Sequence, residues 1–255
     1  MKLSCIGSSS KGNCYILTDE EQCPARYLIL DCGAKWMDVL AGCDFNRSNE
    51  KGCIDGCLFT HRHTDHFYNT NSLKKYVIPS YGSNELSTDA ASEDELWWKT
   101  VIGIPEKQKT SIKDWIVIPW YVPHTGNNNE KIPCFAYMIF SPSGYRMVYL
   151  TDFLHSPLTF KSFKVQTLLI ACNHDDYIEE YENSTKFEHI VSGHSSLSTV
   201  QDIVRINKTD ALRNVILCHL SDDNATPDLM HKTIQETVGE NVNVFIARKG
   251  MKINL

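Results

Sequence analysis

Short runs of apolar or alternating residues, bounded by Gly, Pro, Asn or Asp, dominate the chain and indicate β-strands. The predicted strands are 2–6, 15–18, 27–31, 57–60, 115–122, 135–141, 146–152, 167–172, 214–219, 243–247 and 251–255. Stretches with helical periodicity lie between them, and the predicted helices are 67–76, 84–91, 177–182, 198–207 and 227–238. Two helices carry start signals, because Ser195 and Ser196 precede one of them and Pro227 opens another.

The order of these elements predicts the fold class. The first third of the chain contains consecutive strands joined by turns, as in an antiparallel or mixed sheet. The last third alternates strands with helices, and no repeat, linker or low-complexity tract divides the sequence. We therefore predict one layered α/β domain that covers residues 1–255.

Composition and charge narrow the class of protein further. Of the 255 residues, 42% are hydrophobic and 22% are charged, as in soluble globular proteins. No run approaches the roughly 18 apolar residues that span a bilayer, and residues 1–10 do not resemble a secretory signal. We therefore expect a cytoplasmic protein with no membrane partner. The net charge of −6 gives no sign of a basic face, although a local basic groove is compatible with it.

Ten cysteines stand out from this composition. Without a secretory signal they indicate a reducing compartment rather than disulfides. The one closely spaced pair, Cys53 and Cys57, has no matching second pair, unlike the paired knuckles of zinc fingers. Most other cysteines lie in apolar runs, so we interpret them as small buried hydrophobic side chains.

The hexapeptide His-Arg-His-Thr-Asp-His, from His61 to His66, is the most informative segment. It directly follows a predicted strand, so its side chains can turn together at the strand end. Three imidazoles and a carboxylate suit an apolar core poorly, whereas neutral imidazole and carboxylate are ligands for zinc and related divalent ions. The hexapeptide therefore predicts a metal site.

Further ligands are expected at the ends of other strands, where side chains converge. His124 follows the strand predicted at 115–122, Asp152 ends the strand at 146–152, and His219 ends the strand at 214–219. Each residue alone is equally compatible with a structural role. Together they place imidazole and carboxylate groups at three separate strand ends, which favours metal ligation.

The hexapeptide followed by His124, Asp152 and His219 resembles the ligand series of the metallo-β-lactamase superfamily. The resemblance spans nearly the whole chain and implies the four-layered αβ/βα sandwich of that α/β fold. It also implies two divalent metal ions, expected to be zinc, although manganese and iron accept the same ligands. By this resemblance, His61, His63 and His124 hold one ion, Asp65, His66 and His219 hold the second, and Asp152 bridges them.

Several motifs resemble the YycJ-type (WalJ-like) metal-dependent hydrolases, which are regarded as DNA exonucleases. The matching segments are 7–13, 31–33, 173–175, 193–195 and 219–224. The chain departs from this pattern at Phe153-Leu154, where a Thr-Gly pair is expected, and at Trp97-Trp98, which does not align. The resemblance implies a phosphodiesterase or exonuclease that acts on DNA with water activated by two metal ions. RNA and small phosphodiesters are alternative substrates.

Two residues are predicted to take part in proton transfer. Asp65 is expected to accept the proton of the attacking water. His194 lies in a Gly-His-Ser-Ser turn before a predicted helix, where backbone N–H groups favour an anion. We predict that His194 assists the leaving group, and the alternative is an ordinary loop residue.

The remaining candidates are expected to position ligands or substrate. Asp31, at a strand end, is predicted to orient ligand histidines. The predicted substrate contacts are Ser9, Asn13, Asn173, His174 and Ser195. Asn173 is equally compatible with a helix cap. The Gly/Ser-rich turn 7–13 is compatible with an anion-binding nest or with a hairpin connection. Trp97-Trp98 is interpreted as a packed helix end, with base stacking as the alternative.

Two other functions remain open at this point. One is a small-molecule hydrolase that cleaves a thioester, a lactone or a cyclic phosphodiester at the same site. The other is a noncatalytic metal-binding scaffold, which is disfavoured because no expected ligand is missing from the sequence.

Overall fold

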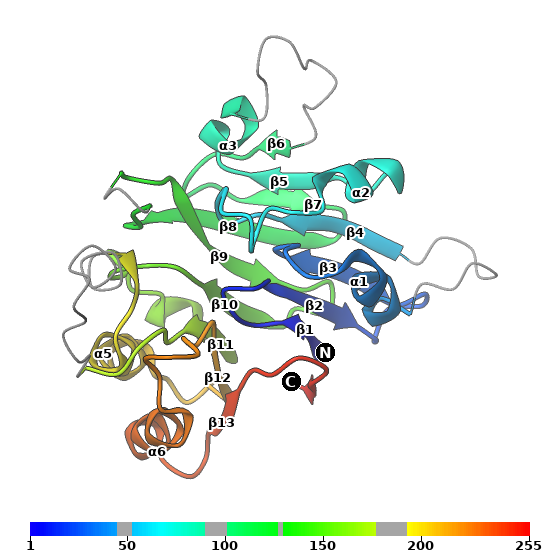
Figure 1. The fold of residues 1–255 in the computed structure, drawn as a ribbon. Coiled ribbons are helices and arrows are strands. Elements are labelled where there is room, and N and C mark those ends of the chain that lie inside the picture. The colour runs from blue at the N-terminus through cyan, green and yellow to red at the C-terminus, as the bar shows by residue number, and fades with distance from the viewer. Residues whose placement is uncertain (45–52, 90–100, 127–129, 177–192) are drawn as a thin grey trace. The chain divides into compact units, whose positions relative to one another are not determined.

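The computed structural model describes residues 1–44, 53–89, 101–126, 130–176 and 193–255 (Figure 1). The strands of the first sheet are β1 (Lys2–Gly7), β2 (Cys14–Asp19), β3 (Arg26–Leu30), β4 (Cys53–Leu58), β5 (Ser80–Gly82), β6 (Val101–Gly103) and β14 (Lys252–Asn254). The strands of the second sheet are β7 (Thr110–Ile112), β8 (Trp115–Val122), β9 (Cys134–Phe140), β10 (Arg146–Leu150), β11 (Thr167–Ala171), β12 (Asn214–Cys218) and β13 (Asn243–Ile246). The helices are α1 (Trp36–Gly42), α2 (Thr70–Lys75), α3 (Asn84–Asp89), the 3-10 helix η2 (Lys161–Phe163), α5 (Leu197–Asn207) and α6 (Pro227–Val238).

The first sheet has the strand order β14-β1-β2-β3-β4-β5-β6. Strands β1, β2 and β3 form an antiparallel meander, and β14 adds to its edge antiparallel to β1. From β3 to β6 the pairing is parallel. The mixed sheet that the consecutive strands predicted is therefore confirmed.

The second sheet has the strand order β13-β12-β11-β10-β9-β8-β7. Strands β10 to β13 pair in parallel, and α5 and α6 connect β11 to β12 and β12 to β13. Figure 1 shows these two helices side by side. Every residue of β11 and β12 is buried, as expected for parallel strands whose two faces are both covered.

The chain forms two compact units. The first contains residues 1–120, 139–145 and 248–255, and the second contains residues 121–138 and 146–247. The first unit therefore holds the whole first sheet and both chain ends, and the second holds the parallel strands of the second sheet. One domain can consist of two such halves, and the single domain expected for residues 1–255 stays a prediction.

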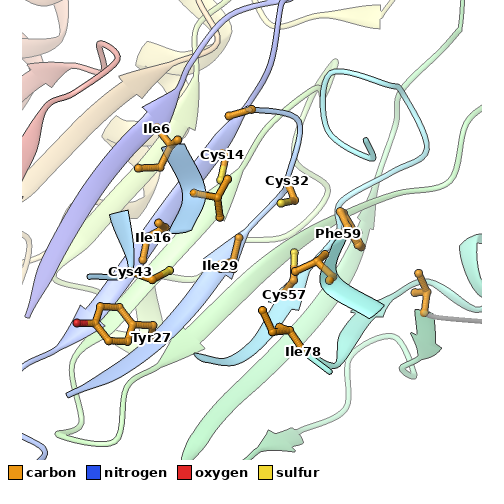
Figure 2. Close-up of a cluster of buried hydrophobic side chains, with 14 of the residues drawn as sticks. Ile6, Cys14, Ile16, Tyr27, Ile29, Cys32, Cys43, Cys57, Phe59 and Ile78 are labelled. Atoms are coloured by element: carbon orange, nitrogen blue, oxygen red, sulfur yellow. The ribbon is translucent and has the colours of Figure 1, made fainter. Parts of the chain in front are cut away.

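A cluster of buried side chains on the first sheet contains four of the cysteines (Figure 2). Cys14, Cys32, Cys43 and Cys57 pack there among isoleucine, phenylalanine and tyrosine side chains. Burial raises the pKa of the Cys14, Cys43 and Cys57 thiols well above the ordinary value, so these thiols stay neutral. Across the chain, eight of the ten cysteines are buried and none is in a disulfide, which confirms their interpretation as packing residues.

Most of the longer predicted elements agree with the structure, but β4 runs from Cys53 to Leu58 where the prediction was 57–60. The other differences involve short elements or elements without a sequence signal. Helix α1 was not predicted, because it spans only seven residues and its N-cap, Lys35, makes no side-chain cap bond. Strands β5, β6 and β7 have three residues each, too few to show a period. The helix predicted at 67–76 begins only at Thr70, because Phe67 still belongs to the turn that starts at His63.

Some predictions fall on other parts of the chain. The helix predicted at 177–182 and the pair Trp97-Trp98 lie outside the described residues. Among the described helices, none has the length and apolar character needed to cross a bilayer.

Candidate metal centre

In the first unit, the loop after β4 brings the side chains of the hexapeptide together. The ring of His61 lies 4.6 Å from that of His63 and 4.4 Å from that of His66, measured between centroids. Candidate ligand atoms of His61 lie within 4.8 Å of those of His63 and of His66, and the same limit holds for Asp65 and His66. The loop thus presents three imidazoles and one carboxylate close enough to share metal ions.

Asp31, directly after β3, is fully buried beneath this loop and bonds to two neighbours. Its carboxylate lies 2.7 Å from Nδ1 of His66 and accepts hydrogen bonds from the backbone N and the hydroxyl of Thr60, at 2.8 and 2.9 Å. Because a carboxylate only accepts, the Thr60 hydroxyl has no proton left for Nδ1 of His61, 3.0 Å away, and accepts from it instead. Both imidazoles therefore carry their proton on Nδ1, and the ring nitrogen with the lone pair is Nε2.

Three backbone segments pack directly against each other around the hexapeptide. The backbone N of Asn13 donates to O of Asp65 at 2.6 Å, and N of Cys32 donates to O of His66 at 2.8 Å. A Cβ atom on Gly33 would lie 1.7 Å from the backbone O of Asp65. This position therefore requires glycine, since any side chain would displace the loop that carries the candidate ligands.

Two predicted substrate contacts, Ser9 and Asn13, are engaged inside the first unit. The amide nitrogen of Asn13 lies 3.0 Å from Oδ2 of Asp65 and 3.1 Å from Nε2 of His66. It also donates to the backbone O of Ser9 at 2.9 Å. The hydroxyl of Ser9 accepts from N of Lys11, which closes the Gly/Ser turn. Asn13 therefore contacts two candidate ligands directly.

In the second unit, histidines gather around Asp152, two residues after β10. A carboxylate oxygen of Asp152 lies 3.1 Å from Nδ1 of His194, and the other lies 3.5 Å from Nε2 of His219. The ring of His194 lies 5.6 Å from that of His124 and 6.2 Å from that of His219. The strand-end residues that the sequence singled out thus converge within this unit, together with His194.

Neighbouring groups hold these imidazoles in place. Nδ1 of His124 donates to the backbone O of Gly193 at 2.8 Å. The amide nitrogen of Asn173 lies 3.1 Å from Nδ1 of His219 and donates to its backbone O at 2.8 Å. The amide oxygen of Asn173 accepts from the backbone N of Ser195 at 3.3 Å. Asn173 therefore ties His219 to the turn that carries His194.

The other two predicted substrate contacts in this unit also bond to backbone. The hydroxyl of Ser195 donates to the backbone O of Ala171 at 2.9 Å. Nδ1 of His174 donates to the backbone O of Asp175 at 2.7 Å. Nε2 of His174 is buried, and no group within the described parts of the chain hydrogen-bonds to it. His174 therefore retains one acceptor atom that no described group uses.

Three of the singled-out residues share an unusual backbone conformation. Asp31, Asp152 and His219 each follow a strand and have φ angles of 51°, 45° and 51°. This left-handed region is sparsely populated by residues other than glycine, although Asp and His enter it more readily than most. Such strain persists where the surrounding structure over-determines it, and it is enriched at functional sites. In each case the left-handed conformation bends the chain just after the strand, at the residue that carries the polar side chain.

The residues present fit divalent metal ions. The candidate ligands are neutral imidazole and carboxylate groups, which suit zinc, manganese and iron. His61, His66 and His124 each donate Nδ1–H to an oxygen of the protein, so Nε2 carries the lone pair that a metal ion would need. Second hydrogen bonds of this kind are typical of metal-binding histidines.

Two contributors were not singled out from the sequence, namely Thr60 and Gly33. Thr60 directly precedes His61, and its hydroxyl joins Asp31 to that imidazole. Gly33 closely follows Asp31, but the need for glycine comes from Asp65, more than thirty residues away. A threonine before a histidine cluster was a usable signal for the first, whereas the second depends on a tertiary contact.

The structure was compared with known proteins. No family model matches the chain, and no curated protein matches it either. Among solved structures, the metallo-β-lactamase fold protein YhfI from Bacillus subtilis is 17% identical, with a TM-score of 0.69 over 99% of this chain and 98% of that one. Zinc-bound PqqB from Methylobacterium extorquens is 13% identical, with a TM-score of 0.69 over 100% of both chains.

A third structure is a diphosphatase from the PhnP family, 15% identical, with a TM-score of 0.63 over 99% of this chain and 96% of that one. At such low identity these similarities establish the fold and not the activity. They agree with the two mixed seven-stranded sheets and their helices. The chain therefore has the metallo-β-lactamase fold.

Proposed function

We propose that this protein is a metal-dependent hydrolase that cleaves phosphodiester bonds, with DNA as its substrate. The observation that carries this proposal is the set of imidazoles around Asp31 and Asp152, each held by a second hydrogen bond or a carboxylate. His61, His63, Asp65, His66, His124, Asp152 and His219 are the proposed ligands of two divalent ions, in the arrangement that the sequence resemblance implies.

Several other residues would orient these ligands. Asp31 acts directly on His66 and, through Thr60, on His61. Asn173 holds His219 from the opposite ring atom to the one nearest Asp152. Groups of this kind fix the tautomer and the direction of an imidazole, and their loss typically lowers metal affinity by about 10–100-fold.

The bound metal ions would supply Lewis acidity, which makes water a better nucleophile and offsets charge on the phosphoryl oxygens. Asp65 would accept the proton of the attacking water, since its carboxylate adjoins His66 and is not fully buried. His194 would donate a proton to the leaving oxygen. Its ring is partly exposed, and its Nδ1 lies 3.1 Å from a carboxylate oxygen of Asp152.

Three features support a phosphodiester substrate. The motifs at 7–13, 173–175 and 219–224 resemble those of YycJ-type exonucleases. A structural neighbour is described as a diphosphatase, which also acts on phosphorus. The unused Nε2 of buried His174 is a polar atom available to a ligand. A small-molecule hydrolase is the second candidate, and the same diphosphatase favours it if the phosphate belongs to a small ester.

The substrate class is tested with purified protein supplied with Zn²⁺ or Mn²⁺. Bis-p-nitrophenyl phosphate is assayed beside labelled linear duplex DNA, single-stranded DNA and RNA. We expect metal-dependent release of nucleotides from DNA. Cleavage of the small diester with every polynucleotide intact would eliminate the nuclease and favour the small-molecule hydrolase. No cleavage of any of the four would contradict a phosphodiester substrate.

The roles of two residues are tested by substitution. Asp152→Ala should lose bound metal and activity together, and a variant that keeps two metal ions per chain would refute a bridging role. His194→Ala should keep its metal but lose about 10²–10⁴-fold in kcat, the usual contribution of a general acid. His155→Ala is the matched control, because this histidine is exposed. An unchanged kcat in His194→Ala would remove His194 from the mechanism.

A further inference from the structure

In the buried cluster on the first sheet, the side chains of Cys14, Cys32 and Cys57 lie close to one another. Figure 2 shows Cys32 with Cys14 on one side and Cys57 on the other. The thiol of Cys32 interacts with both neighbouring thiols. All three side chains are fully buried: Cys14 begins β2, Cys32 lies two residues after β3, and Cys57 is the second-last residue of β4.

A bulge beyond the end of the β2–β3 ladder brings both Asp31 and Cys32 across from Cys14. The last paired residues of the antiparallel β2–β3 ladder are Tyr15 and Leu30, and beyond them N of Gly33 donates to O of Asn13 at 2.9 Å. One side thus carries Cys14 alone between these two links, while the other carries Asp31 and Cys32, as in a β-bulge. The left-handed backbone of Asp31 absorbs the extra residue and lets Cys32 point into the core beside Cys14.

Opposed residues of an antiparallel pair have Cα atoms roughly 4.5–5.5 Å apart. That separation falls inside the range of about 4.4–6.8 Å that a disulfide needs. Cys57 lies one strand further along, paired with Ile29 in the parallel ladder. The register therefore favours Cys14 over Cys57 as the partner of Cys32.

Both cysteines directly follow residues that contact the candidate ligands. Asn13 precedes Cys14 and contacts Asp65 and His66. Asp31 precedes Cys32 and contacts His66. Drawing two sulfurs to the bonded distance of ~2.05 Å would shift both of these neighbours. Because the backbone segments pack without free space at Gly33, that shift would reach the hexapeptide.

We propose that Cys14 and Cys32 form a reversible disulfide when a hydroperoxide oxidises them, and that this bond weakens metal binding by the hexapeptide. The metal part of this inference rests on the proposed function. One sulfur attacks the peroxide O–O bond, becomes a sulfenic acid and releases one water. The second sulfur then displaces a second water from it and forms the S–S bond. Two thiols lose two electrons in total, and one hydrogen peroxide yields two waters.

The burial of both sulfurs determines how this reaction should proceed. The strands must open locally before peroxide arrives, so oxidation should be slow in the folded protein and faster in low denaturant. Exposed Cys23 should react first. A Cys23→Ser background removes that reaction and leaves partly exposed Cys53 and the buried cysteines, which peptide mapping distinguishes.

The test uses full-length Cys23→Ser protein treated with hydrogen peroxide. Peptide mapping by mass spectrometry should show the Cys14 and Cys32 peptides joined with the loss of two hydrogens. Zinc affinity, measured by competition with a chromophoric chelator, should fall by about 10-fold or more and recover with dithiothreitol. Cys14→Ala should abolish this response, and Cys57→Ala, the matched control, should keep it.

Several results would overturn the proposal. These are a bond between Cys32 and Cys57, sulfinic acid without any disulfide, or a Cys14–Cys32 disulfide with unchanged zinc affinity. If Cys14→Ala does not fold, the peptide map and the zinc affinities of the reduced and oxidised Cys23→Ser protein still test the proposal. A reduced protein that binds no zinc would contradict the proposed function and the regulatory effect, while the mapped disulfide would still establish the modification site.

Discussion

At the scale of single residues, this site is organised by side chains that bond to the candidate ligands from behind. Asp31 is fully buried and satisfies its carboxylate with Thr60 and His66. A buried carboxylate is costly unless such donors surround it. Because the fold supplies these donors, the contacts that stabilise the buried Asp31 carboxylate also fix which nitrogen of each imidazole carries the proton.

We expect Asp31→Asn to lower zinc affinity by about 10–100-fold with little change in side-chain volume. An amide nitrogen in place of one carboxylate oxygen would face the N–H or O–H groups of His66 and Thr60, and would not hold both imidazoles in the required tautomer. The measurement is a zinc titration of the purified variant.

The control for this substitution is Asp38→Asn, because Asp38 forms a surface ion pair with Lys249 at 2.7 Å. It should bind zinc as the unmodified protein does. Equal zinc affinity for Asp31→Asn and the control would show that Asp31 does not orient the ligands.

Thr60 allows a separate test of how His61 is held. Thr60→Val keeps the shape but removes the hydroxyl between Asp31 and His61, so zinc affinity should fall, whereas Thr60→Ser should retain it. The valine variant also leaves buried donors or acceptors without a partner, which costs about 1–3 kcal/mol of unfolding free energy. Zinc titration and urea unfolding of both variants would show this. A serine variant as impaired as the valine variant would assign the effect to packing.

At the scale of elements, backbone contacts hold together the loops at three strand ends. The segments around Asn13, Gly33 and Asp65 exchange backbone hydrogen bonds or touch directly. Such contacts leave no room for adjustment, so the position of the ligand loop depends on the two strand ends beside it.

We therefore expect Gly33→Ala to destabilise the fold by about 1–3 kcal/mol, as overpacking does, and to weaken zinc binding. Its Cβ would lie 1.7 Å from O of Asp65, so the loop must move. Gly250→Ala is the comparison: its φ of 87° also disfavours alanine, yet nothing lies within 4 Å of the added atom. That variant should lose stability but keep its zinc affinity. If Gly33→Ala kept its zinc affinity and Gly250→Ala lost it, a role for Gly33 in placing the loop would be contradicted.

At the scale of the whole molecule, the proposed metal ions link ligation to folding. Ions that bind only the folded chain stabilise it by mass action, by about 2.7 kcal/mol at a concentration of 100 times the Kd. For a chain of this size, each kcal/mol moves Tm by roughly 2–4 °C.

Removal of metal with a chelator should therefore lower Tm by about 5–10 °C, measured by differential scanning calorimetry. Added Zn²⁺ should restore the transition. The Asp152→Ala variant should show a much smaller difference between the two conditions, because one proposed ligand is missing. A Tm that changes with neither chelator nor added Zn²⁺ would show that the folded chain does not bind the ion tightly.

Much of this protein follows from local sequence pattern. The strands at 115–122 and 214–218 and the helix at 227–238 have enough periodic residues for their type to be read directly. The hexapeptide from His61 to His66 can be recognised from the sequence alone, because polar groups so densely spaced have few structural uses. The left-handed residues at strand ends and the short strands β5, β6 and β7 carry no such local signature.

The sequence alone determined the mixed strand and helix order, the burial of most cysteines and the candidate ligand series, because each depends on residue type and spacing. Only the tertiary structure decided that Asp31 serves two histidines, that Gly33 must lack a side chain, and that Cys14 faces Cys32. Those facts depend on which distant segments become neighbours, and a residue's own flanking sequence does not encode its neighbours across a sheet.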